Sequence, residues 1–126
     1  GNWFWGKAVA YNGTIIAGCL DGRVYALDAE TGDEAWPPYE TGGAIRGDPV
    51  LVDDLVTFGS EDGKVYALYA GTGTQSWVST LAEPATQVRA SLCAGEGVVY
   101  VHATNQKIYA LETEHGNVLW SFSTGE

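Results

Sequence analysis

Residues 24–36 read VYALDAETGDEAW, and the same pattern returns as VYALYAGTGTQSW at 65–77 and IYALETEHGNVLW at 108–120. Every copy has Tyr-Ala-Leu, then a glycine five residues after the leucine, then a tryptophan four residues after that glycine. The closing tryptophans are 41 and 43 residues apart. Self-similarity at a fixed period of this length predicts a repeat architecture in which equivalent units stack on one another.

The second copy shows how each unit divides into short strands. An Asp-Gly pair such as Asp62-Gly63 between two apolar runs predicts a two-residue type I′ hairpin, in which both central residues have positive φ. Asp53-Asp54 and the run 71–73 (GTG) are further turn signals. The strands expected in this unit are Ile45–Val52, Leu55–Gly59, Lys64–Tyr69 and Gln75–Ser79. Four such strands make an antiparallel sheet of about 40 residues, the size of a propeller blade.

Composition and charge restrict the classes of partner. The chain has 126 residues, which favours one domain (1–126), with units expected at 1–41, 42–84 and 85–126. Its 16 acidic and 6 basic residues give a net charge of −10, which argues against nucleic acid as a partner. No stretch of sequence is long and apolar enough to suggest membrane insertion. Because the chain starts at Gly1 and contains no methionine, we expect a processed product or a piece of a longer protein.

The closing part of each copy resembles the tryptophan-docking repeat of the PQQ-type β-propellers, whose pattern is roughly Ala-x-Asp-x-x-Thr-Gly-x-x-x-Trp. The second copy has Tyr69 at the Asp position, and the third has Glu112 and His115 at the Asp and Thr positions. The resemblance covers nearly the whole chain and implies an all-β fold of propeller blades. Because the family includes both quinoprotein alcohol dehydrogenases and BamB-type assembly scaffolds, it implies the fold more closely than the function. The first copy matches at every position: Ala26, Asp28, Thr31, Gly32 and Trp36.

The repeated glycines and tryptophans are predicted to be structural. The glycines stand where the turn between the third and fourth strands requires left-handed φ, and Asp28 or Thr31 can hydrogen-bond that turn. Each tryptophan offers a large apolar face to pack between neighbouring sheets, and its indole N–H needs an acceptor. The six positions are Gly32, Gly73, Gly116, Trp36, Trp77 and Trp120.

Three blades do not form a closed ring, because closed propellers have about 4–8. They leave two open apolar faces, which isolated monomers rarely expose. The two ends of the chain fall at a similar phase of the repeat, so two chains would supply six blades. The alternative is that the chain is part of a larger propeller, and either case predicts self-association.

The basic residues fall at repeated positions. Arg23, Lys64 and Lys107 precede the third strand of each unit, where solvated edge charges are expected. A second set lies on the first strand, which lines the central channel of a propeller. One interpretation is an ordinary wet channel; the other is a partner contact in which arginines bind a carboxylate or an acidic peptide. The candidate channel or partner-contact residues are Trp5, Lys7, Arg46, Asp48, Arg89 and Ser91.

Signals of catalysis are weak. Quinoprotein dehydrogenases hold their cofactor with a disulfide between adjacent cysteines, a stacking tryptophan and calcium ligands, but Cys19 and Cys93 are far apart at unlike positions of the repeat. They are expected to be small buried residues without an intrachain disulfide. His102 and His115 are expected to be surface histidines and not metal ligands. We therefore predict no catalytic, cofactor-binding or metal-binding residues in this chain.

The resemblance to BamB-type members implies a non-catalytic scaffold for protein–protein contact, outside the cytoplasm (periplasmic or extracellular). One alternative is a fragment of a PQQ-dependent dehydrogenase whose cofactor site lies on other blades. The second alternative is a self-assembling half-propeller that takes no ligand.

Overall fold

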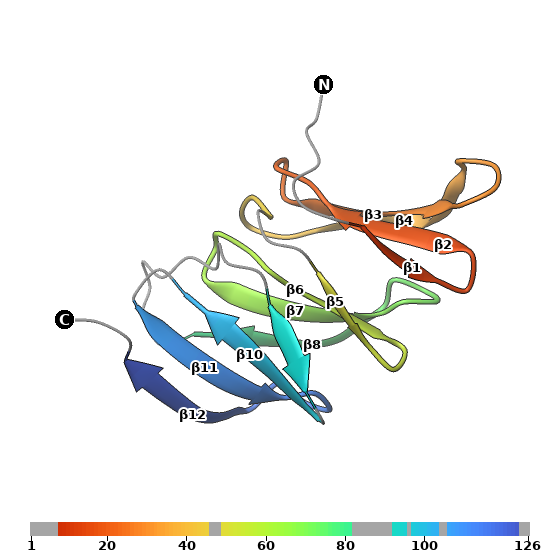
Figure 1. Ribbon diagram of the computed structural model, residues 1–126. Coiled ribbons are helices and arrows are strands. Elements are labelled where there is room, and N and C mark those ends of the chain that lie inside the picture. The colour runs from red at the N-terminus through yellow and green to blue at the C-terminus, as the bar shows by residue number, and fades with distance from the viewer. Residues whose placement is uncertain (1–7, 46–48, 82–91, 96, 104–105, 124–126) are drawn as a thin grey trace.

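The computed structural model describes residues 8–45, 49–81, 92–95, 97–103 and 106–123. Within these residues the chain consists of three separate four-stranded antiparallel sheets and contains no helix (Figure 1). No helix in this part of the chain could therefore cross a membrane. The strands are β1 Val9–Tyr11, β2 Thr14–Gly18, β3 Arg23–Asp28, β4 Glu34–Glu40, β5 Val50–Val52, β6 Leu55–Gly59, β7 Lys64–Tyr69, β8 Gln75–Thr80, β9 Cys93–Gly95, β10 Val98–His102, β11 Lys107–Glu112 and β12 Val118–Ser123.

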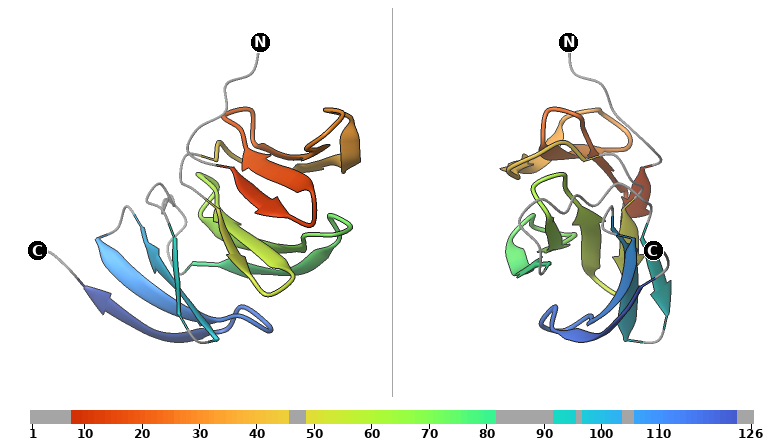
Figure 2. Two further views of the ribbon diagram at one scale, coloured as in Figure 1. Left: turned by 45° about the vertical axis from the view of Figure 1, so that its right-hand side comes forward. Right: turned by 90° about the vertical axis from the view of Figure 1, so that its left-hand side faces the viewer.

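Each sheet is an up-and-down meander whose strands pair in sequence order. The register repeats from sheet to sheet, because the alanine of Tyr-Ala-Leu always pairs with the closing tryptophan. The sheets follow one another side by side along an arc, as the two views of Figure 2 show. The predicted all-β fold of propeller blades is confirmed. The equivalent cross-strand rows are Ile16–Ala26–Trp36, Thr57–Ala67–Trp77 and Tyr100–Ala110–Trp120.

The Asp-Gly turns differ from the prediction. Gly63 has φ +85°, but Asp62 is not at positive φ, and four residues connect β6 to β7. The Asp62 carboxylate instead accepts the backbone N–H of Lys64 at 3.0 Å, so the aspartate organises a wider turn. The two-residue turn with both residues at positive φ occurs at Asn12-Gly13, between β1 and β2.

The first strand of the second unit also begins later than predicted. Ile45 is fully buried but lies outside the strand, and its N–H donates to the Cys19 carbonyl of the first sheet at 3.2 Å. β5 begins at Val50, directly after Pro49, which has no N–H for the strand ladder. The predicted strands Leu55–Gly59 and Lys64–Tyr69 are confirmed as β6 and β7. The fourth strand, β8, is one residue longer than predicted.

The hydrophobic core lies in two seams between successive sheets. We call the side of a sheet that looks toward the next sheet in sequence its C-side face, and the opposite side its N-side face. In the first seam, Ile16 and Trp36 on the C-side face of the first sheet pack with Phe58 and Leu68 on the N-side face of the second. In the second seam, Val65 and Trp77 on the C-side face of the second sheet pack against the N-side face of the third sheet. The residues of the third sheet in this seam are Val99, Val101, Tyr109 and Leu111.

Candidate functional site

In the first seam, one tryptophan joins the first sheet to the second. Trp36 is 5% exposed, and its Nε1–H donates to the carbonyl oxygen of Ala70 at 3.0 Å. The indole lies over Gly73, where an added Cβ would overlap its ring atoms. This glycine also has φ +75°, so its missing side chain serves both the turn and the close approach of the ring.

The second seam repeats this contact with the next copies of the same residues. Trp77 is 6% exposed and donates to the carbonyl oxygen of Thr113 at 2.9 Å. Its ring covers Gly116, where an added Cβ would again overlap the indole. The left-handed φ predicted for the repeated glycines is confirmed, at +78° for Gly32, +75° for Gly73 and +76° for Gly116.

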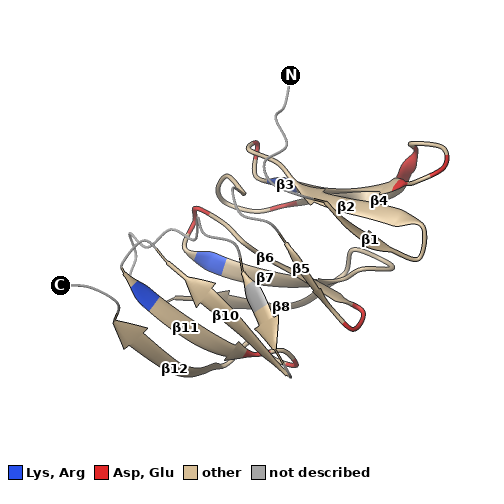
Figure 3. Cartoon of the chain, in the orientation of Figure 1, with Lys and Arg blue, Asp and Glu red and all other residues tan. Residues whose placement is uncertain are grey.

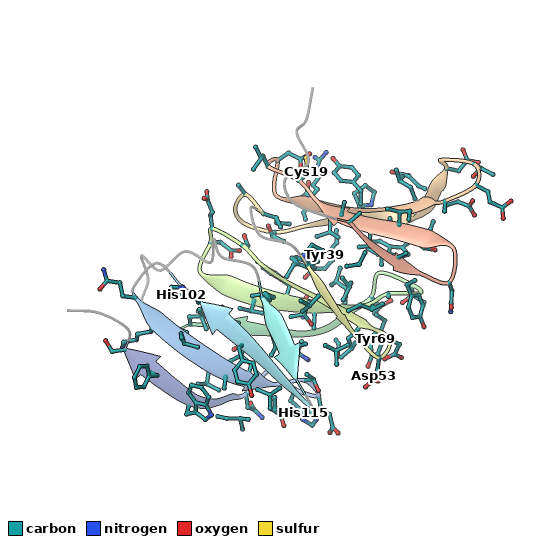
Figure 4. The ribbon with its side chains drawn as sticks, viewed as in Figure 1. Cys19, Tyr39, Asp53, Tyr69, His102 and His115 are labelled. Carbon is teal, nitrogen blue, oxygen red and sulfur yellow. The ribbon has the colours of Figure 1, made fainter. Side chains whose placement is uncertain are left out.

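A tyrosine that sequence reasoning missed also bridges the first seam. The ring of Tyr39 meets that of Tyr66 edge-on, with centroids 5.8 Å apart, and its hydroxyl donates to Gln75 Oε1 at 2.6 Å. Figure 4 places Tyr39 between the first and second sheets. Burial, with the nearby negative charge of Asp62, raises the pKa of this phenol. Its contacts depend on a register shift in β4, which includes Pro37 and Pro38.

Asp62 connects the segment that leads into the second sheet with the sheet itself. Its carboxylate accepts the N–H of Gly42 at 3.0 Å and the hydroxyl proton of Tyr66. Burial and this hydrogen bond raise the pKa of Tyr66 above its ordinary value. The ring of Tyr66 also stacks on Phe58, with centroids 5.5 Å apart. These contacts hold the segment at Gly42 against the second sheet.

The turn after β3 confirms the predicted role of the motif aspartate. Asp28 Oδ1 accepts the backbone N–H groups of Glu30 at 2.8 Å and Thr31 at 3.1 Å. These donors hold the pKa of the exposed carboxyl below its usual value. The Thr31 hydroxyl oxygen accepts the N–H of Asp33 at 3.2 Å, which completes the turn around Gly32.

The C-side face of the third sheet is exposed, in contrast to the same face of the first two sheets. Trp120 is 49% exposed, Phe122 63% and Tyr100 37%. The rings of Tyr100 and Trp120 lie with centroids 6.1 Å apart and form one aromatic surface. No further sheet follows β12 within the described residues. Trp120 therefore lacks the buried position of its two counterparts.

A hollow of about 310 Å³ opens at one end of the second seam. It exists because Val52 stands where Tyr11 fills the first seam, in which that ring reaches Gly71. Figure 4 shows Asp53, Tyr69 and His115 gathered there. Its acidic lining would attract a cation, but the described residues contain no group of three that could hold a metal ion. The lining residues are Val52, Asp53, Asp54, Leu55, Tyr69, Ser76, Thr113, Glu114 and His115.

Cys19, His102 and His115 lie in three different parts of the structure (Figure 4). His102 is the last residue of β10 and is exposed, and His115 Nδ1 lies 3.1 Å from Glu112 Oε1 in an exposed turn. Cys19 is fully buried, as predicted, and its burial raises the pKa of the thiol. The side chain of Cys93 lies outside the described part of the structure.

The basic residues predicted at one repeated position do occupy it. Arg23, Lys64 and Lys107 are the first residues of β3, β7 and β11, and Figure 3 shows them at corresponding points of the three sheets. Arg23 pairs with Glu40 at 3.0 Å, where both side chains are largely exposed. The predicted channel set lies outside the described residues, so its arrangement stays a prediction: Trp5, Lys7, Arg46, Asp48, Arg89 and Ser91.

Sequence reasoning found the buried tryptophans but missed the aromatic residues around the exposed one. Phe122 pairs with Ile108 as Ser79 pairs with Val65, so the two hold the same place in the repeat. Tyr39 holds that place in the first sheet only after the shift in β4 is counted. A register alignment of the fourth strands would have been the signal.

Solved structures with similar folds include BamB, an alcohol dehydrogenase and a designed protein. BamB from Moraxella catarrhalis is 25% identical, with a TM-score of 0.82 over 98% of this chain and 38% of that one. A quinohemoprotein alcohol dehydrogenase from Comamonas testosteroni is 21% identical, with a TM-score of 0.82 over 94% of this chain and 21% of that one. The computationally designed Ika4 protein is 19% identical, with a TM-score of 0.81 over 97% of this chain and 73% of that one.

This chain thus spans less than two fifths of the length of the BamB structure and a smaller share of the dehydrogenase. Comparison with curated proteins gives no significant match. A family model described as "Outer membrane protein assembly factor BamB" matches residues 2–126, almost the whole chain. With its repeated four-stranded sheets and their matching registers, the chain belongs to this family of PQQ-like β-propeller proteins.

Proposed function

We propose that this chain is a non-catalytic β-propeller scaffold for protein–protein contact that works outside the cytoplasm, in the periplasm or extracellular space. The observation that carries the proposal is the exposed aromatic face of Tyr100, Trp120 and Phe122. In the two preceding sheets the same face is a contact surface with another sheet. Membership in a BamB-type family supports the role, because assembly factors act through protein contacts.

The tryptophans have a docking role in this proposal. Trp36 and Trp77 hold neighbouring sheets together. Each ring is buried over a glycine of the next sheet, and each indole N–H donates to a carbonyl of that sheet. Trp120 carries the same side chain on an open face and is a contact residue for another protein surface. Aromatic anchors of this kind often dominate the binding free energy of an interface.

A second contact surface is proposed on the channel side. Arg46 and Arg89 stand at equivalent places of the repeat and would bind a carboxylate-rich segment of a partner. Replacing both with alanine is expected to abolish binding of such a partner and to leave the melting temperature nearly unchanged. Unaltered binding in the double variant would remove this surface from the proposal.

The scaffold role can be tested by placing a photo-crosslinking amino acid at position 122 of the chain, exported to the periplasm of a Gram-negative bacterium. The matched control carries the same group at position 72, in an exposed turn. We expect discrete protein adducts from position 122 and none from position 72. Equal, diffuse labelling at both positions would refute a dedicated contact face.

The catalytic alternative has its own assay. The purified chain is mixed with PQQ, calcium, a primary alcohol and a dye that accepts electrons. The scaffold proposal predicts no turnover above the rate of the cofactor mixture alone. Turnover that requires the chain would overturn the non-catalytic assignment and favour a dehydrogenase fragment.

A further inference from the structure

The chain carries both halves of a contact that it does not complete within itself. In each seam, an indole covers a glycine of the next sheet and donates to the carbonyl three residues before that glycine. Trp120 is the third indole of the series and is half exposed. Gly32 is the corresponding glycine of the first sheet, with φ +78°, and no described residue lies within 4 Å of a Cβ built on it.

The surfaces around these two positions match the surfaces that already meet in the seams. On the N-side face of the second sheet, Tyr66 and Leu68 are buried against the first sheet. The same face of the first sheet carries Tyr25 and Leu27 at the same places of the register, but both are only half-buried. The first sheet therefore presents the residue types that cover a C-side face elsewhere in the molecule. The third sheet presents an uncovered C-side face at the opposite end of the array (Figure 1).

We propose that the C-side face of the third sheet binds the N-side face of the first sheet in a second copy of this chain. In this contact Trp120 covers Gly32 of the other copy, and its Nε1–H donates to the carbonyl oxygen of Ala29. Ala29 holds the place of Ala70 and Thr113, because its N–H bonds to the turn glycine Gly13 as Thr113 bonds to Gly97. The proposal rests on the proposed function, since it names the partner of one contact surface.

The proposed contact joins the last sheet of one copy to the first sheet of the other. The contact is head-to-tail, and a head-to-tail contact gives a ring when the rotation closes. Two chains contribute six sheets, which is within the range of about 4–8 blades found in closed propellers. Each copy then uses its Trp120 once and its Gly32 once, so the ring has two identical new seams. Because each chain has a charge of −10, added salt is expected to strengthen the dimer by screening repulsion.

The test measures the mass of the 126-residue chain by analytical ultracentrifugation between about 1 and 500 µM, the range in which weak to moderate contacts appear. We expect conversion from the 13.4 kDa monomer to a species of twice that mass. Trp120→Ser should raise the dissociation constant at least about 30-fold, the lower bound for an interface hot spot. Gly32→Asn should do the same, because asparagine tolerates positive φ but fills the space that the indole needs.

Mixing the two variants supplies the decisive control. Trp120 of the Gly32→Asn chain can still cover Gly32 of the Trp120→Ser chain, so the mixture is expected to form a heterodimer through one intact seam. Tyr69→Ser removes a side chain of similar exposure outside the contact and should leave the dimer unchanged. Far-UV circular dichroism of each variant shows that the monomer remains folded.

A chain that stays monomeric to 500 µM, or a dimer insensitive to both variants, would overturn the second-copy contact. Neither result would affect the scaffold role, because crosslinks from position 122 to other proteins and the arginine variants test that role separately. Failure of the proposed function and failure of this inference are therefore distinguishable.

Discussion

Truncation of Trp77 to alanine tests whether the indoles in the seams stabilise the array. Replacing the ring removes roughly 150 Å² of buried apolar surface, or about 4 kcal/mol at ~25 cal/mol per Å². The lost hydrogen bond to the Thr113 carbonyl adds about 1 kcal/mol. Partial collapse of the neighbours offsets some of this loss, so Trp77→Ala should lower the free energy of unfolding by about 3–5 kcal/mol.

The matched control is Trp120→Ala, which makes the same change at the equivalent position of the third sheet. Because Trp120 is 49% exposed and Trp77 is 6% exposed, the control should cost about 1 kcal/mol or less. Urea denaturation followed by circular dichroism measures both, at a protein concentration low enough to keep the chain monomeric. Equal losses in the two variants, or a loss below about 1 kcal/mol for Trp77→Ala, would refute the seam account.

Three further outcomes follow from the same geometry. Gly116→Ala places a methyl group where the indole of Trp77 lies, whereas Gly32→Ala adds the same group at a similar φ in open space. In urea denaturation of the monomer, Gly116→Ala should therefore lower the free energy of unfolding more than Gly32→Ala. Tyr39→Phe removes the hydroxyl bonded to Gln75 and should cost about 1 kcal/mol, and a double-mutant cycle with Gln75→Ala should show that the two losses are not additive. Because folding lowers the pKa of Asp28, its stabilising effect is complete above the unfolded pKa of about 4 and is lost as pH falls through the folded pKa. The free energy of unfolding of Asp28→Asn, measured during acid titration, should therefore depend less on pH than that of the native chain.

The repeat period and the Tyr-Ala-Leu motif were sufficient to predict the sheets, because apolar and turn residues recur at the same offsets. The strands Leu55–Gly59 and Lys64–Tyr69 have local signals at both ends, so their bounds were predicted without error. The prediction that a strand begins at Ile45 was wrong. The side chain of Ile45 is buried against the first sheet, and the sequence pattern around an apolar residue does not show whether it is buried in a strand or in a loop. The predicted two-residue turn at Asp62-Gly63 was wrong because the Asp62 carboxylate accepts the backbone N–H of Lys64 and organises a wider loop.

The exposed aromatic face and the hollow were harder to predict than the strands. The exposure of a side chain on a face depends on whether another sheet covers that face. Trp36, Trp77 and Trp120 are identical in the motif, but their exposure depends on whether another sheet follows. The hollow beside Val52 arises from a difference between seams, the replacement of an aromatic ring by a smaller side chain. Such a difference is visible only when equivalent positions of the repeat are compared in register.

The faces at the two ends of the array carry the repeated residues but do not pack on another described sheet, so their side chains can differ without disturbing a seam. Residues in the seams determine stability, whereas residues on the end faces are available for contact with another protein. A change at Gly73 or Gly116 affects two sheets at once, because each glycine lies under the indole of the sheet before it. The third sheet carries Phe122 where the second has Ser79 and the first has Tyr39, and its C-side face adds Tyr100 where the other sheets have Ile16 and Thr57. Aromatic enrichment is a property of interface cores and not of ordinary solvent-exposed strands. In the proposed function, the face that no described sheet covers is therefore the one that binds another protein surface.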